Sequence, residues 1–528
     1  MIINRGKAPL VEALLAYSSS DKKSFHVPGH KNGKAYEDSG GAELLSEVMK
    51  IDVTEISGTD DLHHPEGVIR EAQELAADCF GAEESFFLVG GSTSGNLAMI
   101  LTVCTQPGDI LLLQRNVHKS VLNGLMLAGA KAVFMDPEID EASGLAVIPS
   151  TETLRSALTA YPEAKGVLIT SPNYYGMSSS LGELADLCHG YHIPLLVDEA
   201  HGAHFGMHPD LPESALASGA DGVVQSTHKM LTAMTMGAML HVQGELLDRR
   251  LLRQRLAMVQ SSSPSYPVMA SLDLARRLLH AQGPSAFTAG FAAVEALKRG
   301  LATLPRFGLL QPPQPEQTAA ATTAGGQAPP PQIHAAAYMR QDPFKAVIYD
   351  RTGALSGYGL QHALEARGCV PEMSDERYVV LLFTLGSTEE DVNHLLWALQ
   401  HIVEEEVAST SPEDIPHQPL SVLSNVSTWN ISRNTAPFSE PVQFSLTPQD
   451  RDQVESVLVE HCGGRIAAEM VIPYPPGIPI LYSGEQIIEE TANRLIALRD
   501  AGAKCQGAED HTIRTILVYK NSRKQGTI

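Results

Sequence analysis

Two stretches decide the fold of this chain, PLLVDEAHGAH at residues 194–204 and GVVQSTHKML at residues 222–231. Each starts as a short apolar run and ends in polar and charged side chains, a pattern that predicts a buried strand with functional groups at its carboxyl end. Parallel strands end at one edge of a sheet, and ligands bind at that edge. We therefore expect Asp198 and Lys229 to face a single ligand.

Strand and helix patterns alternate before and between these two stretches. Further strands are expected at 85–91, 109–114, 131–136 and 166–170, and helices at 66–81, 94–104, 153–162 and 182–191. Short apolar runs separated by helices are typical of parallel strands joined by crossover helices. The sequence thus predicts an α/β domain with a doubly wound, mainly parallel sheet over residues 52–285.

The rest of the chain divides by composition. Polar, low-complexity stretches cannot bury a core, and two of them interrupt the carboxyl-terminal half. The expected segments are an N-terminal arm at 1–51, a connecting helix at 286–310, an insertion at 311–332, a small α+β domain at 333–408, a polar linker at 409–441 and a C-terminal domain at 442–528.

The composition excludes several classes of protein. Lysine and arginine total 38 against 61 aspartate and glutamate, and a net charge of -23 opposes binding to nucleic acids and anionic membranes. The six cysteines form no CxxC pair, so we expect neither a disulfide framework nor a metal site. No apolar run reaches the roughly 18 residues of a membrane helix, and residues 1–10 lack a signal-peptide pattern. We expect a cytoplasmic protein.

Lys229 is the first candidate for chemistry, because it directly follows a buried strand. Lost hydration lowers the pKa of a lysine there, and the uncharged amine is the form that attacks an aldehyde to make a Schiff base. The string STHKML at 226–231 is also compatible with a lysine at the rim of a domain, where its ammonium group reaches water.

Asp198 supplies the second signal. A carboxylate at this edge can keep a pyridinium nitrogen protonated, which is the condition under which pyridoxal phosphate (PLP) accepts electrons. The letters DEAH also occur in Mg²⁺ motifs of helicases. The chain has no GxxxxGK[ST] loop and is acidic, which argues against that interpretation.

Two further motifs follow expected strands. In FFLVGGSTSGNLAM at 86–99, glycines, hydroxyls and a helix N-terminus are suited to a phosphate, although such a turn can also be purely structural. In RNVHKS at 115–120, His118 can stack on an aromatic ring or lie in a solvated loop.

Together these strings carry a resemblance to a known family. FHVPGHKNG, DVTEISGTDDLHHPEG, GGSTSGN, RNVHKS, VDEAHGAH, STHKML, SSSPSY and PYPPGIPI occur in this order along nearly the whole chain, apart from the two polar stretches. The chain resembles the bacterial ornithine/lysine/arginine decarboxylases, in their short form without an N-terminal wing domain. The resemblance implies the fold of PLP-dependent transferases, fold type I.

The resemblance also implies roles for individual residues. Lys229 would hold PLP as a Schiff base, Asp198 would pair with the pyridine nitrogen, and His118 and Ala200 would cover the two ring faces. Lys229, Asp198, His118 and His228 are the expected catalytic residues. Further cofactor contacts are expected from Ser92, Thr93, Ser94, His201, Ser226 and His228, most of them at the phosphate, and from Ser261 of a partner subunit. A homodimer or higher homo-oligomer with shared active sites follows.

Three carboxylates are expected to meet the substrate. Glu372 matches the family residue that contacts the distal cation, and Asp60 and Asp61 match a segment near the site entrance. Pro371 precedes Glu372 where other members have an aliphatic residue, and the polar surroundings also fit a merely solvated carboxylate.

The expected activity is decarboxylation of a basic L-amino acid, with arginine ahead of lysine and ornithine, in polyamine biosynthesis. The same cofactor residues would serve an aminotransferase or a lyase of this fold, and a PLP-binding regulatory pseudoenzyme is the non-enzymatic alternative. The sequence does not choose between Lys229 and His228 as the donor of the proton to Cα.

Overall fold

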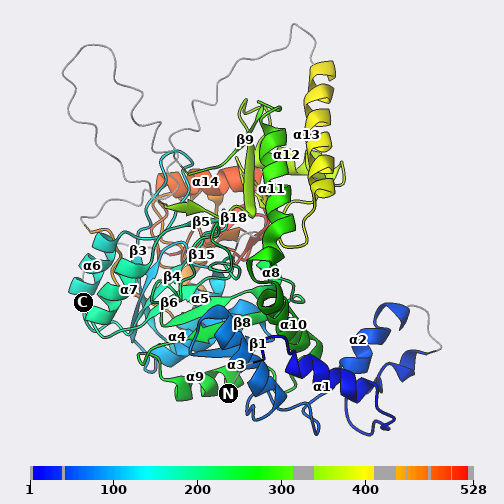
Figure 1. The fold of residues 1–528 in the computed structure, drawn as a ribbon. Coiled ribbons are helices and arrows are strands. Elements are labelled where there is room, and N and C mark those ends of the chain that lie inside the picture. The colour runs from blue at the N-terminus through cyan, green and yellow to red at the C-terminus, as the bar shows by residue number, and fades with distance from the viewer. Residues whose placement is uncertain are drawn as a thin grey trace.

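The computed structural model describes residues 4–37, 42–312, 338–409, 436–447, 450–473, 477–500 and 502–520. Most of the predicted insertion at 311–332 and of the predicted linker at 409–441 lies outside these residues. Helices α1 (Pro9–Ser18) and α2 (Ser46–Ile51) lie at the lower right of Figure 1, beside the large sheet, and α13 (Glu389–Ser409) lies at the upper right, away from that sheet.

The large domain is built on an eight-stranded sheet with the order β1-β8-β7-β6-β4-β2-β3-β14. Neighbouring strands from β7 to β3 pair in parallel, whereas β8 is antiparallel to both of its neighbours and β14 is antiparallel to β3. This confirms the predicted doubly wound, mainly parallel α/β fold. The strands are β1 (Glu84–Leu88), β2 (Ile110–Gln114), β3 (Lys131–Met135), β4 (Val167–Thr170), β6 (Leu195–Asp198), β7 (Gly222–Gln225), β8 (Ala238–Val242) and β14 (Val442–Gln443).

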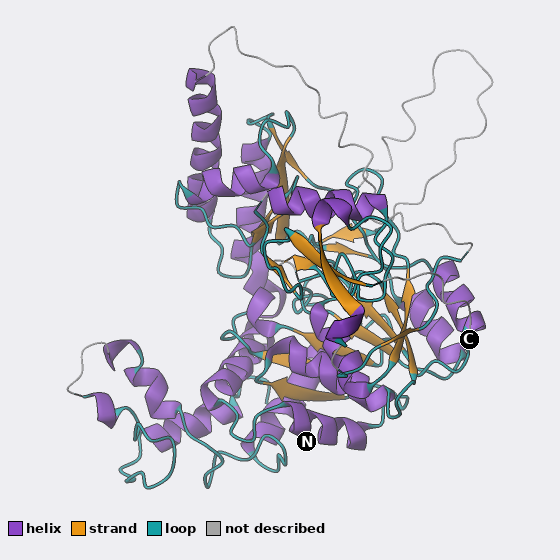
Figure 2. Cartoon of the chain, turned by 180° about the vertical axis from the view of Figure 1, so that it is seen from behind, coloured by secondary structure: helices purple, strands orange, loops and turns teal. Residues whose placement is uncertain are grey.

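Alternate side chains of the strands feed two apolar layers. Leu111 and Leu113 join one hydrophobic cluster, whereas Leu112 between them joins the other, because successive side chains of a strand point to opposite faces. Helices cover both faces of the sheet (Figure 2). One layer contains α4 (Gly91–Val103), α5 (Lys119–Ala128) and α9 (Arg249–Val259), and the other α3 (Val68–Phe80), α6 (Thr151–Ala160), α7 (Gly182–Gly190) and α10 (Tyr266–Gln282).

Gly95 allows α4 to lie close to the sheet. A Cβ atom at this position would stand 2.4 Å from Cγ2 of Val224 and 2.9 Å from Cδ1 of Leu88. No other residue fits such a gap without moving the helix. The close approach brings the N-terminus of α4 beside the carboxyl end of β7.

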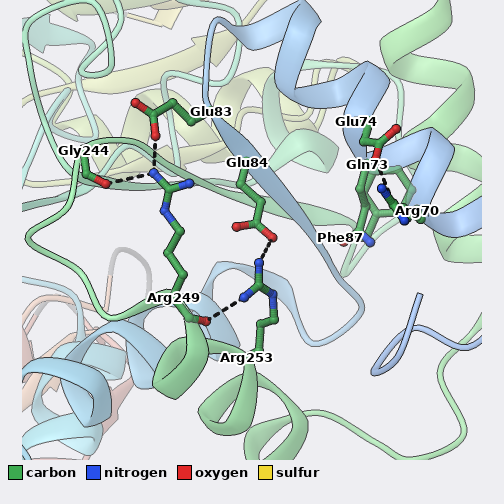
Figure 3. Close-up of polar contacts among 9 residues, drawn as sticks. All are labelled: Arg70, Gln73, Glu74, Glu83, Glu84, Phe87, Gly244, Arg249 and Arg253. Atoms are coloured by element: carbon green, nitrogen blue, oxygen red, sulfur yellow. Dashed lines mark hydrogen bonds and ion pairs between the residues drawn. The ribbon is translucent and has the colours of Figure 1, made fainter. Parts of the chain in front are cut away.

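The edge strand β1 is held by side chains from two helices (Figure 3). Gln73 of α3 accepts a hydrogen bond from the backbone N–H of Phe87 at 3.0 Å. Side-chain partners of this kind protect an edge strand from pairing with other chains. Two ion pairs join α9 to β1 and the residue before it, Arg249 with Glu83 and Arg253 with Glu84.

The small domain contains a four-stranded antiparallel sheet with the order β12-β13-β11-β9. Its strands are β9 (Phe307–Leu309), β11 (Lys345–Asp350), β12 (Met373–Ser374) and β13 (Val379–Leu382), and its helices are α11 (Thr288–Leu301), α12 (Gly357–Glu365) and α13. A two-stranded ribbon of β5 (Met177–Ser178) and β10 (Arg340–Gln341) connects it to the large domain.

The carboxyl-terminal unit has a hydrophobic cluster of its own. It contains the strand pairs β15 (Val454–Leu458) with β18 (Thr515–Tyr519) and β16 (Ile472–Pro473) with β17 (Cys505–Gln506), and helix α14 (Glu489–Asp500). The phenol of Tyr482 donates to the backbone oxygen of Arg115 at 2.5 Å, and the N–H of Lys119 donates to the backbone oxygen of Gly477 at 3.1 Å. This unit therefore supports the loop that carries His118.

Candidate active site

Asp198 and Lys229 lie at the carboxyl ends of neighbouring parallel strands. Asp198 closes β6 opposite Val224 of β7, and Lys229 follows β7 in the single-turn helix α8 (Thr227–Met230). Burial lowers the pKa of Lys229, while the charges of Asp198 and Glu372 act in the opposite direction. The two residues thus lie at the same edge of the sheet, the edge that the sequence predicts.

Asn96 on α4 fixes the carboxylate of Asp198. Its Nδ2 donates to Oδ2 of Asp198 at 2.8 Å and to Oγ of Ser120 at 3.0 Å, and the N–H of Ala200 donates to Oδ1 of Asp198 at 3.2 Å. Asn96 is fully buried, and its Oδ1 has no hydrogen-bond partner among the described residues. Sequence reasoning missed Asn96, although its spacing of four from Ser92 puts both side chains on one helix face.

His118 is a neutral ring with a defined tautomer. It caps α5, and its Nδ1 accepts from the N–H of Ser120 at 3.2 Å. Burial lowers the pKa of His118 to about 4, with Asp198 opposing and Lys229 assisting the shift. At neutral pH its single proton is therefore on Nε2. An uncharged ring is suited to packing against an aromatic ligand.

His228, next to Lys229, carries its proton on the other nitrogen. Its Nδ1 lies 2.9 Å from the backbone oxygen of Gly237, which can only accept. Burial lowers the pKa of His228, and the hydrogen bond to Gly237 opposes this. The neutral ring then has a lone pair on Nε2.

His201 stands between two lysines. Its Nε2 lies 3.1 Å from Nζ of Lys229 and its Nδ1 lies 2.9 Å from Nζ of Lys345, at the start of β11. The ring of Tyr174 lies 4.6 Å from that of His201, between centroids. Sequence reasoning missed Lys345 and Tyr174. The available signal for Lys345 was a lysine opening the apolar run FKAVIYD at 344–350.

Hydroxyl groups line the N-terminus of α4. Oγ of Ser226 donates to Oγ of Ser92 at 2.9 Å, so the end of β7 and the start of α4 meet. Oγ of Ser94 donates back to the carbonyl of Gly91, and Thr93 is exposed. Gly91 has a φ of 70°, a conformation that glycine adopts without strain. The backbone N–H groups at a helix start and the helix dipole make this position suitable for a phosphate.

Glu372 lies within electrostatic reach of Lys229, Lys345 and His228. It is exposed and directly precedes β12, where its N–H donates to the carbonyl of Val380 at 3.0 Å. Its charge raises the pKa of Lys229, Lys345 and His228. The carboxylate is thus close enough to influence the buried amines while remaining accessible to a ligand.

Asp60, Asp61 and Ser261 make their hydrogen bonds away from Lys229. The carboxylate of Asp60 accepts N–H groups at the start of α3, including that of Gly67 at 2.8 Å, and Asp61 caps the turn after it. Ser261 is exposed, and its carbonyl lies 2.8 Å from Nε2 of His63. Within the described residues, no hydrogen bond or ion pair joins these three residues to Lys229.

The described residues contain no group of three or more histidine, cysteine, aspartate or glutamate side chains that is arranged to hold a metal ion. None of the helices within those ranges combines the length and the apolar character needed to cross a bilayer.

Comparison with known proteins gives consistent matches. Residues 8–391 match the model of the Orn/Lys/Arg decarboxylase major domain, and residues 436–512 match that of the C-terminal domain. The chain is 39% identical to the uncharacterized protein YaaO of Bacillus subtilis (strain 168), over 98% of this chain and 99% of that protein. It is 33% identical to the arginine decarboxylase of the same organism, over 99% of each. The structure of the Francisella novicida lysine decarboxylase LdcF covers 97% of this chain and 81% of its own, with a TM-score of 0.76 and 19% identity, which shows a shared fold.

Proposed function

The chain belongs to the Orn/Lys/Arg decarboxylase family, and from that premise we propose that it uses PLP to decarboxylate a basic L-amino acid in polyamine biosynthesis. The observation that carries this proposal is the pair of half-buried Lys229 and buried Asp198 at one sheet edge. An amine with a lowered pKa beside a fixed carboxylate is the arrangement that binding of a pyridine aldehyde requires.

The residues present fit PLP. The amine of Lys229 suits the aldehyde, the carboxylate of Asp198 suits the ring nitrogen, and the start of α4 with Ser92 and Ser226 suits the phosphate. The buried Oδ1 of Asn96, which lacks a partner among the described residues, points to a polar group still missing from this space. Further contacts are proposed for Thr93, Ser94, His118, Ala200, His201 and His228.

PLP bound here would supply an acceptor for the electron pair that departing CO₂ leaves at Cα. Asp198, held by Asn96 and by the N–H of Ala200, would keep a proton on the ring nitrogen. The neutral ring of His118 would pack on the ring face and exclude water. These contributions act mainly where charge develops in the transition state.

The tautomer of His228 favours Lys229 as the donor of the proton to Cα. Nδ1 of His228 donates to Gly237, so the neutral ring has no proton on Nε2 to give. Burial lowers the pKa of His228 and disfavours the doubly protonated ring that could donate. Lys229 can hold a proton beside Asp198 once its amine is no longer bonded to the cofactor.

Arginine is the first proposed substrate, ahead of lysine and ornithine. Glu372 is the proposed partner of the distal cation, because a carboxylate can pair with a guanidinium through two charge-assisted hydrogen bonds. The relative named arginine decarboxylase, at 33% identity over the full length, supports this order. Asp60 and Asp61 are secondary candidates at the entrance.

Transamination is disfavoured by the position of Arg377. An aminotransferase usually clamps the substrate carboxylate with an arginine of the small domain. Here the guanidinium of Arg377 lies 5.2 Å from the ring centroid of Tyr349 and 5.1 Å from that of Tyr378, where it stacks on these rings. This supports loss of CO₂ over amino transfer, and the full set of cofactor residues argues against a regulatory pseudoenzyme.

The active form is proposed to be a cytoplasmic homodimer. The N-terminal arm exposes Phe25 by 94%, Leu44 by 87% and Val27 by 62%, and exposed large apolar side chains on an extended arm suit an interface with a second copy of the chain. Ser261 would reach the partner's phosphate site. All six cysteines are free, as in proteins of a reducing compartment.

Product analysis tests the proposal. The full chain is incubated with PLP and an equimolar mixture of arginine, lysine and ornithine, and amines and CO₂ are quantified by mass spectrometry. Agmatine is expected as the main amine, with cadaverine and putrescine behind it. Lys229→Ala, the matched control, should form none and should lose the visible absorbance of bound PLP. Exchange with pyruvate or glutamate without CO₂ release would contradict decarboxylation.

A further inference from the structure

A row of three nitrogen bases runs beneath the site from the large domain to the small domain. Nζ of Lys229 lies 3.1 Å from Nε2 of His201, and Nδ1 of the same ring lies 2.9 Å from Nζ of Lys345. His201 and Lys345 are only 4% and 2% exposed. The decarboxylation proposed above gives a task to Lys229 but none to Lys345.

The hydrogen bonds of this row limit the number of protons that its three groups can carry. A neutral imidazole has one N–H group and one lone pair, whereas an ammonium has only donors. The N–H of His201 therefore needs an uncharged lysine as its acceptor, and the lone pair on its other nitrogen accepts from the other lysine. Burial and the two neighbouring lysines hold the pKa of His201 well below its usual range, so the ring is neutral. The row has room for no more than one ammonium.

We propose that Lys345, His201 and Lys229 form a proton relay, in which Lys345 is a positioning residue that sets the protonation of Lys229 through His201. Nζ of Lys345 gives a proton to Nδ1 of His201, and Nε2 gives its own proton to Nζ of Lys229. An N–H bond breaks at Lys345 and forms at Nδ1, and another breaks at Nε2 and forms at Lys229, so charge moves from one lysine to the other without water. The reverse transfer restores an uncharged Lys229.

Carboxylates at both ends allow the charge to rest on either lysine. Asp198 and Glu372 act on Lys229, and Asp342 and Glu372 act on Lys345. Burial opposes the charge at both ends and lowers the pKa of Lys345 to about 8. His118, His228 and Tyr174 are further titratable groups that face the row. Because each end has a stabilising charge, the relay can run in both directions.

The backbone around Lys345 keeps its amine in the row. Gly176 approaches so closely that a Cβ there would stand 2.6 Å from Cβ of Lys345, and Gly176 has a φ of 84°. The N–H of Lys345 donates to the carbonyl of Asp342 at 3.1 Å, and Asp342 itself pairs with buried His204 at 3.0 Å. The stem of Lys345 is thus enclosed between the two domains, and its amine cannot turn to solvent.

The relay predicts opposite effects of two substitutions on the pKa of Lys229. Lys345→Met removes the competing proton site, so Lys229 retains its proton to higher pH. Lys345→Arg keeps a permanent cation on Nδ1 of His201, which directs the Nε2 proton to Lys229 and holds Lys229 uncharged. We expect a rise of about one pKa unit for Met and a fall of about one unit for Arg, each a roughly tenfold change in reactivity at fixed pH.

The measurement is competitive labelling of the full chain, freed of cofactor, with acetic anhydride across a pH series. The Lys229 peptide is quantified by mass spectrometry, and circular dichroism checks the fold of each variant. The matched control is Lys131→Met, which also replaces a lysine at the start of a strand and should leave Lys229 unchanged.

A shift of the same sign in both variants, or no shift, would overturn the relay, because a purely structural role of Lys345 makes no distinction between the two replacements. If Lys345→Met does not fold, Lys345→Arg decides alone, and an unchanged or raised pKa of Lys229 contradicts the proposal. The inference rests on the proposed role of Lys229. The labelling uses neither PLP nor substrate, so failure to form an amine would count against the proposed function alone.

Discussion

The inner edge of the large sheet and the outer surface around Ser261 are both candidate parts of one active site, yet they are built differently. At the inner edge, Asp198 is 3% exposed and Asn96 is fully buried, and their side chains are joined by a direct hydrogen bond. On the outer surface, Ser261 is exposed, and the carboxylate of Asp60 is occupied by N–H groups of its own chain.

The two regions differ in how much of their function a single chain can complete. Burial lowers the pKa of Lys229 and His228, so the inner edge acquires its chemistry from folding alone. No comparable burial acts on Ser261, whose proposed role depends on a second copy of the chain. Substitutions should therefore have their largest effects on catalysis at the inner edge and smaller effects on affinity outside it.

Asp198→Ala should give the largest loss. Without the carboxylate, no residue would hold the proposed proton on the ring nitrogen of PLP. We expect kcat to decrease by about 10²- to 10³-fold, as for the loss of one electrostatic contact to the transition state. Steady-state release of CO₂ measures it. Asp198→Asn, which keeps the shape but not the charge, should be nearly as slow. Near-normal turnover of either variant would remove Asp198 from its assigned role.

Asn96→Ala tests whether Asn96 acts through the Asp198 carboxylate. The substitution removes the hydrogen bond from Nδ2 to the Asp198 carboxylate. A hydrogen bond to a charged group contributes roughly 1.5–3 kcal/mol, so we expect kcat to fall about 10- to 100-fold. In the double variant with Asp198→Ala, the second substitution should add little. Additive losses would show that Asn96 does not act through Asp198.

Glu372→Gln lies at the boundary between the two regions. Loss of the charge should raise KM for arginine about tenfold, while kcat changes less, because the contact holds the substrate before and during the reaction. The same carboxylate raises the pKa of Lys229, so its removal lowers that pKa and should move the alkaline limb of the pH profile to lower pH. Glu376→Gln, a nearby exposed carboxylate, is the control. Equal KM values would place the distal cation elsewhere.

The sequence predicted the inner edge well because its signals are local. Apolar runs followed by Asp198 or Lys229 specify both the strand and the edge at which the side chain emerges. Strand β8, between β1 and β7, was not among the strands expected. Its antiparallel direction could not be predicted either, because the sequence of a short buried strand does not indicate whether it pairs in parallel or antiparallel.

Contacts between distant segments could not be predicted in this way. Lys345 is 144 positions from His201, and only the packing of the small domain on the large one brings them together. Asn96 stands in the quoted GGSTSGN string, but its contact with Asp198 depends on the depth at which Gly95 lets α4 settle. Such distances are set by tertiary packing, which no local pattern encodes.

Ser261→Ala should have the smallest effect, and it tests directly whether the outer surface serves the partner's site or the site of its own chain. If the hydroxyl reaches the partner's phosphate, its loss removes one hydrogen bond of about 1 kcal/mol and weakens PLP binding about fivefold, with kcat at saturating PLP unchanged. Equilibrium titration with PLP measures this, and Ser262→Ala, at the adjacent exposed serine, is the matched control. In a mixture with Lys229→Ala chains, hybrid dimers would place the intact Ser261 beside the intact Lys229 and restore wild-type affinity at that site. Affinity that stays weak in such hybrids would mean that Ser261 serves its own chain, and the outer surface would then belong to the same unit as the inner edge.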